Sequence, residues 1–198
     1  MKNYKKNLKL LENNHVYSKE MEHDACGVGV IVSTEGKKSR KIVEYGIEAL
    51  KAVWHRGAVD ADGKTGDGAG IHVEIPKDFF IEKIEVTGHD YENAEICVGM
   101  IFLPKNDYAA QESCKTIVES ELTRNNFSIY GWRQVPVNPK VLGQKALQTI
   151  PEIIQVLFKS NDPNLLDKRL ERKIYETRKR IENKAFQLSL NNFYVCSI

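Results

Sequence analysis

Cys26 has the clearest capacity for chemistry, because it heads an apolar, β-branched run and has small residues on both sides. If the chain is cut between Ala25 and Cys26, a thiol and a free α-amino group belong to one residue. A nucleophile and its base then lie within a few ångströms of each other without further folding. The amine has a reference pKa of about 7.7–8.0, so it can act as the base without a histidine. The pattern predicts that residues 1–25 are a removable leader and that Cys26 is an N-terminal nucleophile.

Arg56 and His55 are the next candidates, at the end of an expected helix. A guanidinium near Cys26 would favour the thiolate and hold carbonyl or carboxylate groups. The alternative for Arg56 is a surface or packing residue beside Trp54. A lone histidine is more often structural than catalytic, so Arg56 is the stronger candidate.

A glycine-rich loop over residues 57–70 invites a nucleotide-binding interpretation, which the spacing does not support. Its first glycine is one residue too distant from Lys64 for a phosphate loop, and the preceding element is a helix rather than a strand. A calcium loop fails as well, because Lys64 and Ile71 occupy positions that require oxygen ligands. We therefore expect no metal site here. Glycines allow tight turns and close backbone approach, which suits either a loop beneath an active site or a plain structural loop.

The elements that must position these residues follow from the apolar pattern. Residues 27–33 are expected to form a buried strand, and residues 71–75 alternate in character as a second strand would. Between them, Ser39 is a plausible N-cap for an amphipathic helix that runs to about residue 55. Residues 1–25 show no sustained apolar period, and a frayed terminus is the alternative to a leader.

From residue 94 onward the expected elements follow a β-α-β-β-α-β order, which is the split pattern of ferredoxin-like units. The expected strands are residues 96–103, 127–135, 153–158 and 192–198, and the expected helices are residues 107–124 and 165–187, with a short helix or turn at 140–149. The many basic residues of the second helix alternate with glutamates at spacings of three and four, which indicates a salt-bridged, solvated face.

Composition narrows the class of protein. The chain has 198 residues and a net charge of +2, with no apolar run of membrane-spanning length and no long basic stretch, so neither a membrane nor a nucleic acid is an expected partner. Its four cysteines are irregularly spaced, which disfavours a disulfide framework or a zinc site. A protein without disulfides is expected in the reducing cytoplasm. Cys97 and Cys196 are expected in the core. Because the chain stops within an apolar strand pattern, we expect it to be part of a longer protein.

Several motifs together closely resemble the N-terminal class II glutamine amidotransferase domain of glutamate synthase large subunits. They are residues 24–29, 55–58, 64–71, 130–137, 171–175 and 193–197. The Thr-Gly-Asp-Gly-Ala-Gly stretch of residues 65–70 is the most specific of them. The resemblance implies an α/β (α+β) chain with the four-layer αββα fold of N-terminal-nucleophile hydrolases, incomplete at the C-terminus. Residues 1–25 would be the propeptide, and residues 26–198 the N-terminal part of the domain.

The resemblance also implies a site and a reaction. Cys26 would be the nucleophile, Arg56 would order the site beside it, and Gly66, Asp67 and Gly68 would belong to an active-site loop. In this reaction the Cys26 thiolate would attack the side-chain amide of L-glutamine and give a γ-glutamyl thioester and ammonia. The ammonia would then aminate 2-oxoglutarate elsewhere in the synthase.

The cofactors of the family, FMN and an iron–sulfur cluster, are expected in the full-length protein, and none is expected in this segment. The expected partners are the remaining synthase domains, with a small subunit as a further candidate. The oxyanion-hole and substrate-binding groups are expected beyond Ile198, so the 198-residue chain alone is expected to be inactive. Two alternatives remain open from the residues themselves: a non-catalytic interaction or regulatory module of the same fold, and a stand-alone hydrolase of another amide.

Overall fold

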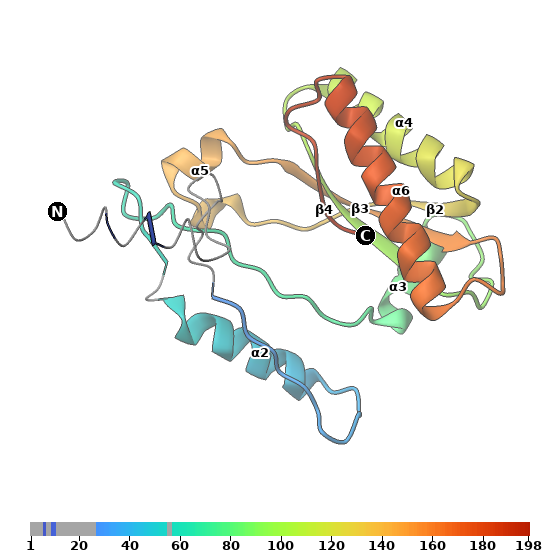
Figure 1. Ribbon diagram of the computed structural model, residues 1–198, viewed down its shortest axis with the longest axis horizontal. Coiled ribbons are helices and arrows are strands. Elements are labelled where there is room, and N and C mark those ends of the chain that lie inside the picture. Colours follow the sequence, from blue (N-terminus) through green and yellow to red (C-terminus); the bar gives the residue numbers. More distant parts are fainter. Residues whose placement is uncertain (1–5, 7–8, 11–26, 55–56) are drawn as a thin grey trace. The chain divides into compact units, whose positions relative to one another are not determined.

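The computed structural model describes residues 6, 9–10, 27–54 and 57–198, and the chain divides into two compact units, Met1–Ala58 and Val59–Ile198 (Figure 1). In the first unit, helix α2 spans Arg40–Ala52. The Ser39 hydroxyl accepts a hydrogen bond from the backbone amide of Lys41 at 3.2 Å, which satisfies one of the free amides at the helix start. The expected helix and its cap are therefore confirmed.

The second unit contains a four-stranded antiparallel sheet whose strands lie in the order β2-β3-β1-β4. Its elements in chain order are α3 (Lys77–Val86), β1 (Cys97–Leu103), α4 (Tyr108–Arg124), β2 (Phe127–Gln134), a 3₁₀ turn η2 (Pro139–Val141), α5 (Gln144–Gln148), β3 (Glu152–Ser160), α6 (Asp167–Gln187) and β4 (Tyr194–Ser197). Both β1 and β2 run antiparallel to β3, which lies between them, so β1-α4-β2 is a split crossover unit. The expected β-α-β-β-α-β arrangement is confirmed.

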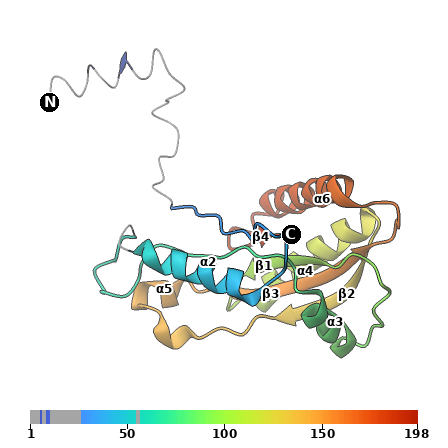
Figure 2. The ribbon, with the colours of Figure 1, turned by 90° about the horizontal axis from the view of Figure 1, so that it is seen from below.

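One face of the sheet packs against α4 and α6 (Figure 2). Strand β1 alternates strictly, with buried residues at every second position. Gly99 lies opposite Val156 in β3, and a Cβ atom at Gly99 would come within 2.7 Å of the Val156 side chain. This glycine therefore lets the two central strands share a tightly packed core.

Helix α4 begins at Asp107, whose carboxylate accepts a hydrogen bond from the amide of Ala110 at 2.9 Å. Helices α4 and α6 are linked by Glu121, a buried carboxylate whose Oε1 lies 2.7 Å from the Lys184 Nζ atom and 3.2 Å from the Arg124 guanidinium. Two cations thus compensate one buried charge. Helix α6 carries the expected ion pairs: Arg172–Glu176 is exposed, and Arg178–Glu182 is half-buried beside β4, where Arg178 also donates to the Val195 carbonyl.

The opposite face of the sheet is partly covered by α3, a helix that the sequence pattern did not reveal. Phe80 and Ile84 of α3 pack with Ile96, Tyr130 and Leu157 in a second cluster of buried side chains. Because apolar residues face both sides, β3 is the most deeply buried strand of the sheet.

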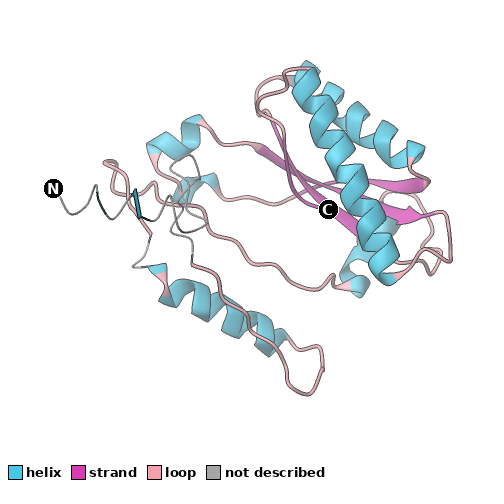
Figure 3. Ribbon diagram, viewed as in Figure 1, coloured by secondary structure: helices cyan, strands magenta, loops and turns pink. Residues whose placement is uncertain are grey.

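The two strands expected at residues 27–33 and 71–75 are not formed, and both segments run as loops (Figure 3). Val28, Val30 and Val32 are 89%, 81% and 70% exposed. A strand depends on a hydrogen-bonded neighbour, and within the described residues no strand pairs with either segment. The apolar pattern shows that these residues are suited to a strand, but not that a neighbouring strand is present to pair with them.

One further expectation was wrong. Cys196 is exposed rather than buried, because β4 turns Val195 toward the core and the next residue away from it. Cys97, by contrast, is buried as expected.

The α/β class is confirmed, with an antiparallel sheet and its helices. The described part of the chain supplies one of the two sheets that an αββα sandwich contains. In the same part of the chain, no helix combines the length and apolar character needed to cross a bilayer.

Candidate active site

The predicted site residues fall into two groups. Cys26 and Arg56, together with His55, lie outside the described residues, so their roles stay predictions. Gly66, Asp67 and Gly68 are described and form one exposed stretch of the glycine-rich loop.

The segment before this stretch folds back on itself. Val59 and Gly66 form an antiparallel bridge, and the amide of Asp60 donates to the Thr65 carbonyl at 2.7 Å. Gly63 turns the chain with φ of 67°, a left-handed conformation that favours glycine. The loop is therefore a closed turn rather than an open strand.

Asp62 organises the interior of this turn. Its Oδ1 atom accepts hydrogen bonds from the amides of Lys64 and Thr65, at 2.9 and 2.7 Å, and its Oδ2 atom accepts one from the Thr65 hydroxyl at 2.5 Å. The amides of Lys64 and Thr65 therefore already donate to a carboxylate and are not available to bind a phosphate.

These bonds, the one from the Thr65 hydroxyl first, hold the pKa of Asp62 well below its ordinary value of 3.8. The charged form is therefore favoured by folding. The contribution of Asp62 to loop stability is present above the ordinary pKa and is lost as the pH falls through the lowered one.

The turn is bound to the start of α5, about 80 residues further along the chain. The amide of Lys145 donates to Asp62 Oδ2 at 3.4 Å, the amide of Ala146 donates to the Thr65 hydroxyl oxygen at 3.3 Å, and the Lys145 ammonium pairs with the Asp60 carboxylate. The sequence contains a signal for the turn itself, because an aspartate three residues before a threonine is typical of side-chain-capped turns. It contains no local signal for the partner at α5.

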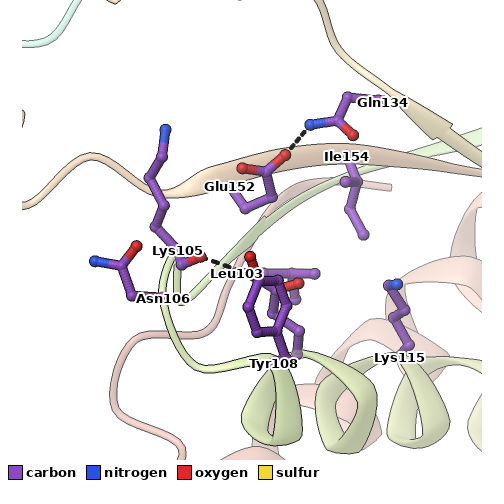
Figure 4. A pocket seen from close by; sticks show the side chains of 9 residues that line it. Leu103, Lys105, Asn106, Tyr108, Lys115, Gln134, Glu152 and Ile154 are labelled. Carbon is purple, nitrogen blue, oxygen red and sulfur yellow. Dashed lines mark hydrogen bonds between the residues drawn. The ribbon is translucent and has the colours of Figure 1, made fainter.

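Two cavities open on the second unit. The first has a volume of about 330 Å³ and lies where β1 ends and α4 begins. Figure 4 shows Tyr108 and Lys115 rising from α4 toward Gln134 and Glu152, which come from the sheet. Several of its polar groups already have partners: Gln134 donates to Glu152, Gln111 donates to the Lys105 carbonyl at 3.1 Å, and Lys115 pairs with Glu112, outside the lining, at 2.8 Å.

The second cavity, of about 420 Å³, lies beside His89, Tyr130 and Lys159. Within the described part of the chain, the buried Tyr130 hydroxyl has no hydrogen-bond partner. Burial raises the pKa of Tyr130, and the positive charge of Lys159 acts in the opposite direction. None of the described cysteines lines either cavity. Among the described residues, no group of three or more histidine, cysteine or acidic side chains could hold a metal ion.

The described cysteines differ in burial, which allows a chemical test. Burial raises the pKa of Cys97 to about 12, and burial together with the charge of Asp107 raises that of Cys114 to about 11. At pH 8 roughly one Cys97 thiol in ten thousand is ionised, and the thiolate is the form that reacts. We expect iodoacetamide at pH 8 to modify exposed Cys196 and to leave Cys97 and Cys114 intact, as measured by peptide mass spectrometry. Modification of Cys97 at a rate close to that of Cys196 would contradict the buried environment.

The chain is similar to proteins of one family. The family model for class II glutamine amidotransferases matches residues 26–198. The chain is 49% identical over 195 residues to the large chain of glutamate synthase [NADPH] from Azospirillum brasilense, covering 98% of this chain and 13% of that protein.

It is also 39% identical over 197 residues to the ferredoxin-dependent glutamate synthase of Pyropia yezoensis and 36% identical over 193 residues to glutamate synthase [NADH] from Saccharomyces cerevisiae. These alignments cover 96% and 92% of this chain, but 12% and 9% of the two relatives. The chain thus spans only a small part of the length of the relatives that it matches. The expectation drawn from the motifs is confirmed, and the chain belongs to the class II glutamine amidotransferase family of N-terminal-nucleophile hydrolases.

Proposed function

We propose that this chain is the glutamine-hydrolysing segment of a glutamate synthase, with Cys26 as its nucleophile. The observation that carries the proposal is that the family match begins at Cys26, the residue that the sequence pattern selected on chemical grounds. The similar proteins named above, which differ in electron donor, are all glutamate synthases.

The proposed reaction begins with removal of residues 1–25, which frees the α-amino group of Cys26. This amine takes the thiol proton, and the thiolate attacks the side-chain amide carbon of glutamine to give a tetrahedral oxyanion. The intermediate collapses to a γ-glutamyl thioester as the amine returns the proton to the leaving ammonia. Water, activated by the same amine, then cleaves the thioester and releases glutamate. Arg56 would favour the thiolate through its charge.

Gly66, Asp67 and Gly68 are proposed as an active-site loop. Two features support this role: the three residues are exposed, and they follow a turn whose conformation is fixed by hydrogen bonds. Exposed backbone on a fixed support can approach a substrate closely, which glycine permits and larger residues hinder.

The remaining steps are assigned to parts of the protein outside this chain. There, ammonia would aminate 2-oxoglutarate at a site that uses FMN and an iron–sulfur cluster. We place the protein in the cytoplasm, with a small subunit as a further candidate partner. The described residues do not fit a cluster site, because Cys97 and Cys114 are protonated core thiols and Cys196 faces outward. The chain itself would supply ammonia for glutamate biosynthesis and nitrogen assimilation.

The function is tested on the intact protein purified from its native host. We expect an N-terminus at Cys26 in the intact mass, and we expect ammonia release from glutamine with glutamate as the product. An active glutaminase that retains residues 1–25 would contradict the role of the amine. An intact protein that releases no ammonia from glutamine would contradict the proposal as a whole and favour a non-catalytic module.

A further inference from the structure

The closed turn of residues 59–66 and the start of α5 are locked together by Asp62, Thr65 and Gly143, which we call the Asp62 clamp. Asp62 uses both carboxylate oxygens: Oδ1 caps the turn at Lys64 and Thr65, and Oδ2 receives the Thr65 hydroxyl and the amide of Lys145. The hydroxyl of Thr65 donates to Asp62 and accepts from the amide of Ala146. One carboxylate and one hydroxyl thus join two segments that lie far apart in the sequence.

Gly143 shows how closely these segments approach. It is buried, and a Cβ atom built on it would lie well inside van der Waals contact with Asp62 Oδ2 and Thr65 Oγ1, and 2.6 Å from the Thr65 amide nitrogen. The last of these atoms belongs to the backbone and cannot rotate away. An alanine at position 143 must therefore separate the loop from α5. The φ angle of Gly143 is −73°, which any residue adopts, so only the close approach selects glycine here.

The clamp ends where the proposed active-site loop begins, because Gly66 follows Thr65 directly. Gly66, Asp67 and Gly68 are exposed, so packing in the core does not fix their positions, and glycine loses more conformational entropy on ordering than any other residue. The bridge between Val59 and Gly66 ties Gly66, the first residue of the exposed stretch, to the backbone of the turn. Whatever fixes the turn therefore also fixes the point from which the exposed stretch departs.

We propose that Asp62 is a positioning residue for glutamine hydrolysis, which holds Gly66, Asp67 and Gly68 in their working arrangement through Thr65 and the α5 backbone. This inference rests on the proposed function. It assigns a role to Asp62, Thr65 and Gly143, for which the sequence alone predicted none. Small displacements of positioning elements reduce the rate strongly, because reaction requires a narrow range of geometries.

The test compares the Asp62→Ala, Asp62→Asn and Gly143→Ala variants of the intact protein. We expect Asp62→Ala and Gly143→Ala each to lower kcat for glutamine hydrolysis by about 10–100-fold. KM should change less, because the groups that bind glutamine are expected elsewhere in the protein. Asp62→Asn keeps one carbonyl oxygen for the amides of Lys64 and Thr65, so it should recover part of the loss. Hydrogen exchange at Gly66, Asp67 and Gly68 should accelerate in the two variants with the larger loss.

Asp107→Ala is the matched control, because it also removes an exposed capping aspartate of this unit, one that accepts from Ala110 at the start of α4. It should lower Tm while kcat stays at the wild-type value. The double variant Asp62→Ala/Gly143→Ala should lose much less than the product of the two single losses, since both changes open the same contact.

The outcomes separate the two proposals. An active wild type with an unimpaired Asp62→Ala variant would refute the positioning role alone, and so would equal losses of kcat in Asp62→Ala and Asp107→Ala. An inactive wild type would refute the proposed function and the role of Asp62 with it.

Discussion

Replacing Cys26 by alanine is expected to abolish glutamine-dependent activity of the intact protein, with a fall in kcat of about 10⁴–10⁶-fold. Alanine removes the sulfur atom that forms the thioester. Without that atom the reaction must pass through direct attack of water on an unactivated amide. The measurement is ammonia release from glutamine under saturating substrate. A reduction of less than about tenfold would show that another group carries the reaction.

Two controls make this result specific to the nucleophile. Cys196→Ala removes an exposed thiol from β4 and should leave the activity at the wild-type level. Glutamate formation from externally added ammonia should also survive in Cys26→Ala, because the proposed second site receives ammonia directly. A variant that loses both glutamine-dependent and ammonia-dependent activity would be misfolded, and Cys26→Ser would then separate folding from chemistry.

Helices α2, α4 and α6 and the order of strands in the second unit could be predicted from the sequence. The signals of these helices are local: the buried positions of α6, including Leu170, Ile174 and Ile181, recur at helical spacing, and the cap at Ser39 can be recognised from a single side chain. The strand order within the sheet followed from the split β-α-β-β-α-β pattern, in which each helix returns the chain past one intervening strand.

The features that could not be predicted depend on distant partners. Residues 27–33 have the composition of a strand, but strand formation requires a neighbour whose identity no local pattern records. The same holds for the Asp62 clamp, since nothing near Gly143 in sequence indicates that Thr65 will lie against it. Helix α3 was missed because its two buried residues, Phe80 and Ile84, are too few to establish a period.

The second large effect is expected in stability, at the centre of the sheet. Phe158 is fully buried in β3, lies opposite Cys97 of β1 and Ile129 of β2, and meets the Phe127 ring edge-on at 5.3 Å between centroids. Phe158→Ala removes this contact and leaves a cavity between the sheet and helices α4 and α6, so it should lower the free energy of unfolding by about 3–5 kcal/mol. That is a large share of the 5–15 kcal/mol typical of a domain. Urea denaturation followed by circular dichroism measures the change.

Phe186→Ala is the matched control, because this phenylalanine is 84% exposed near the end of α6 and its removal opens no cavity. Its effect should stay within about 0.5 kcal/mol. The two variants also distinguish stability from catalysis. Phe158 belongs to the core, so at low temperature, where the variant is still folded, kcat per folded molecule should match the wild type. At higher temperature the activity should fall in step with the folded fraction. A lowered kcat in fully folded Phe158→Ala would instead show that the packing around β3 affects the positions of the reacting groups.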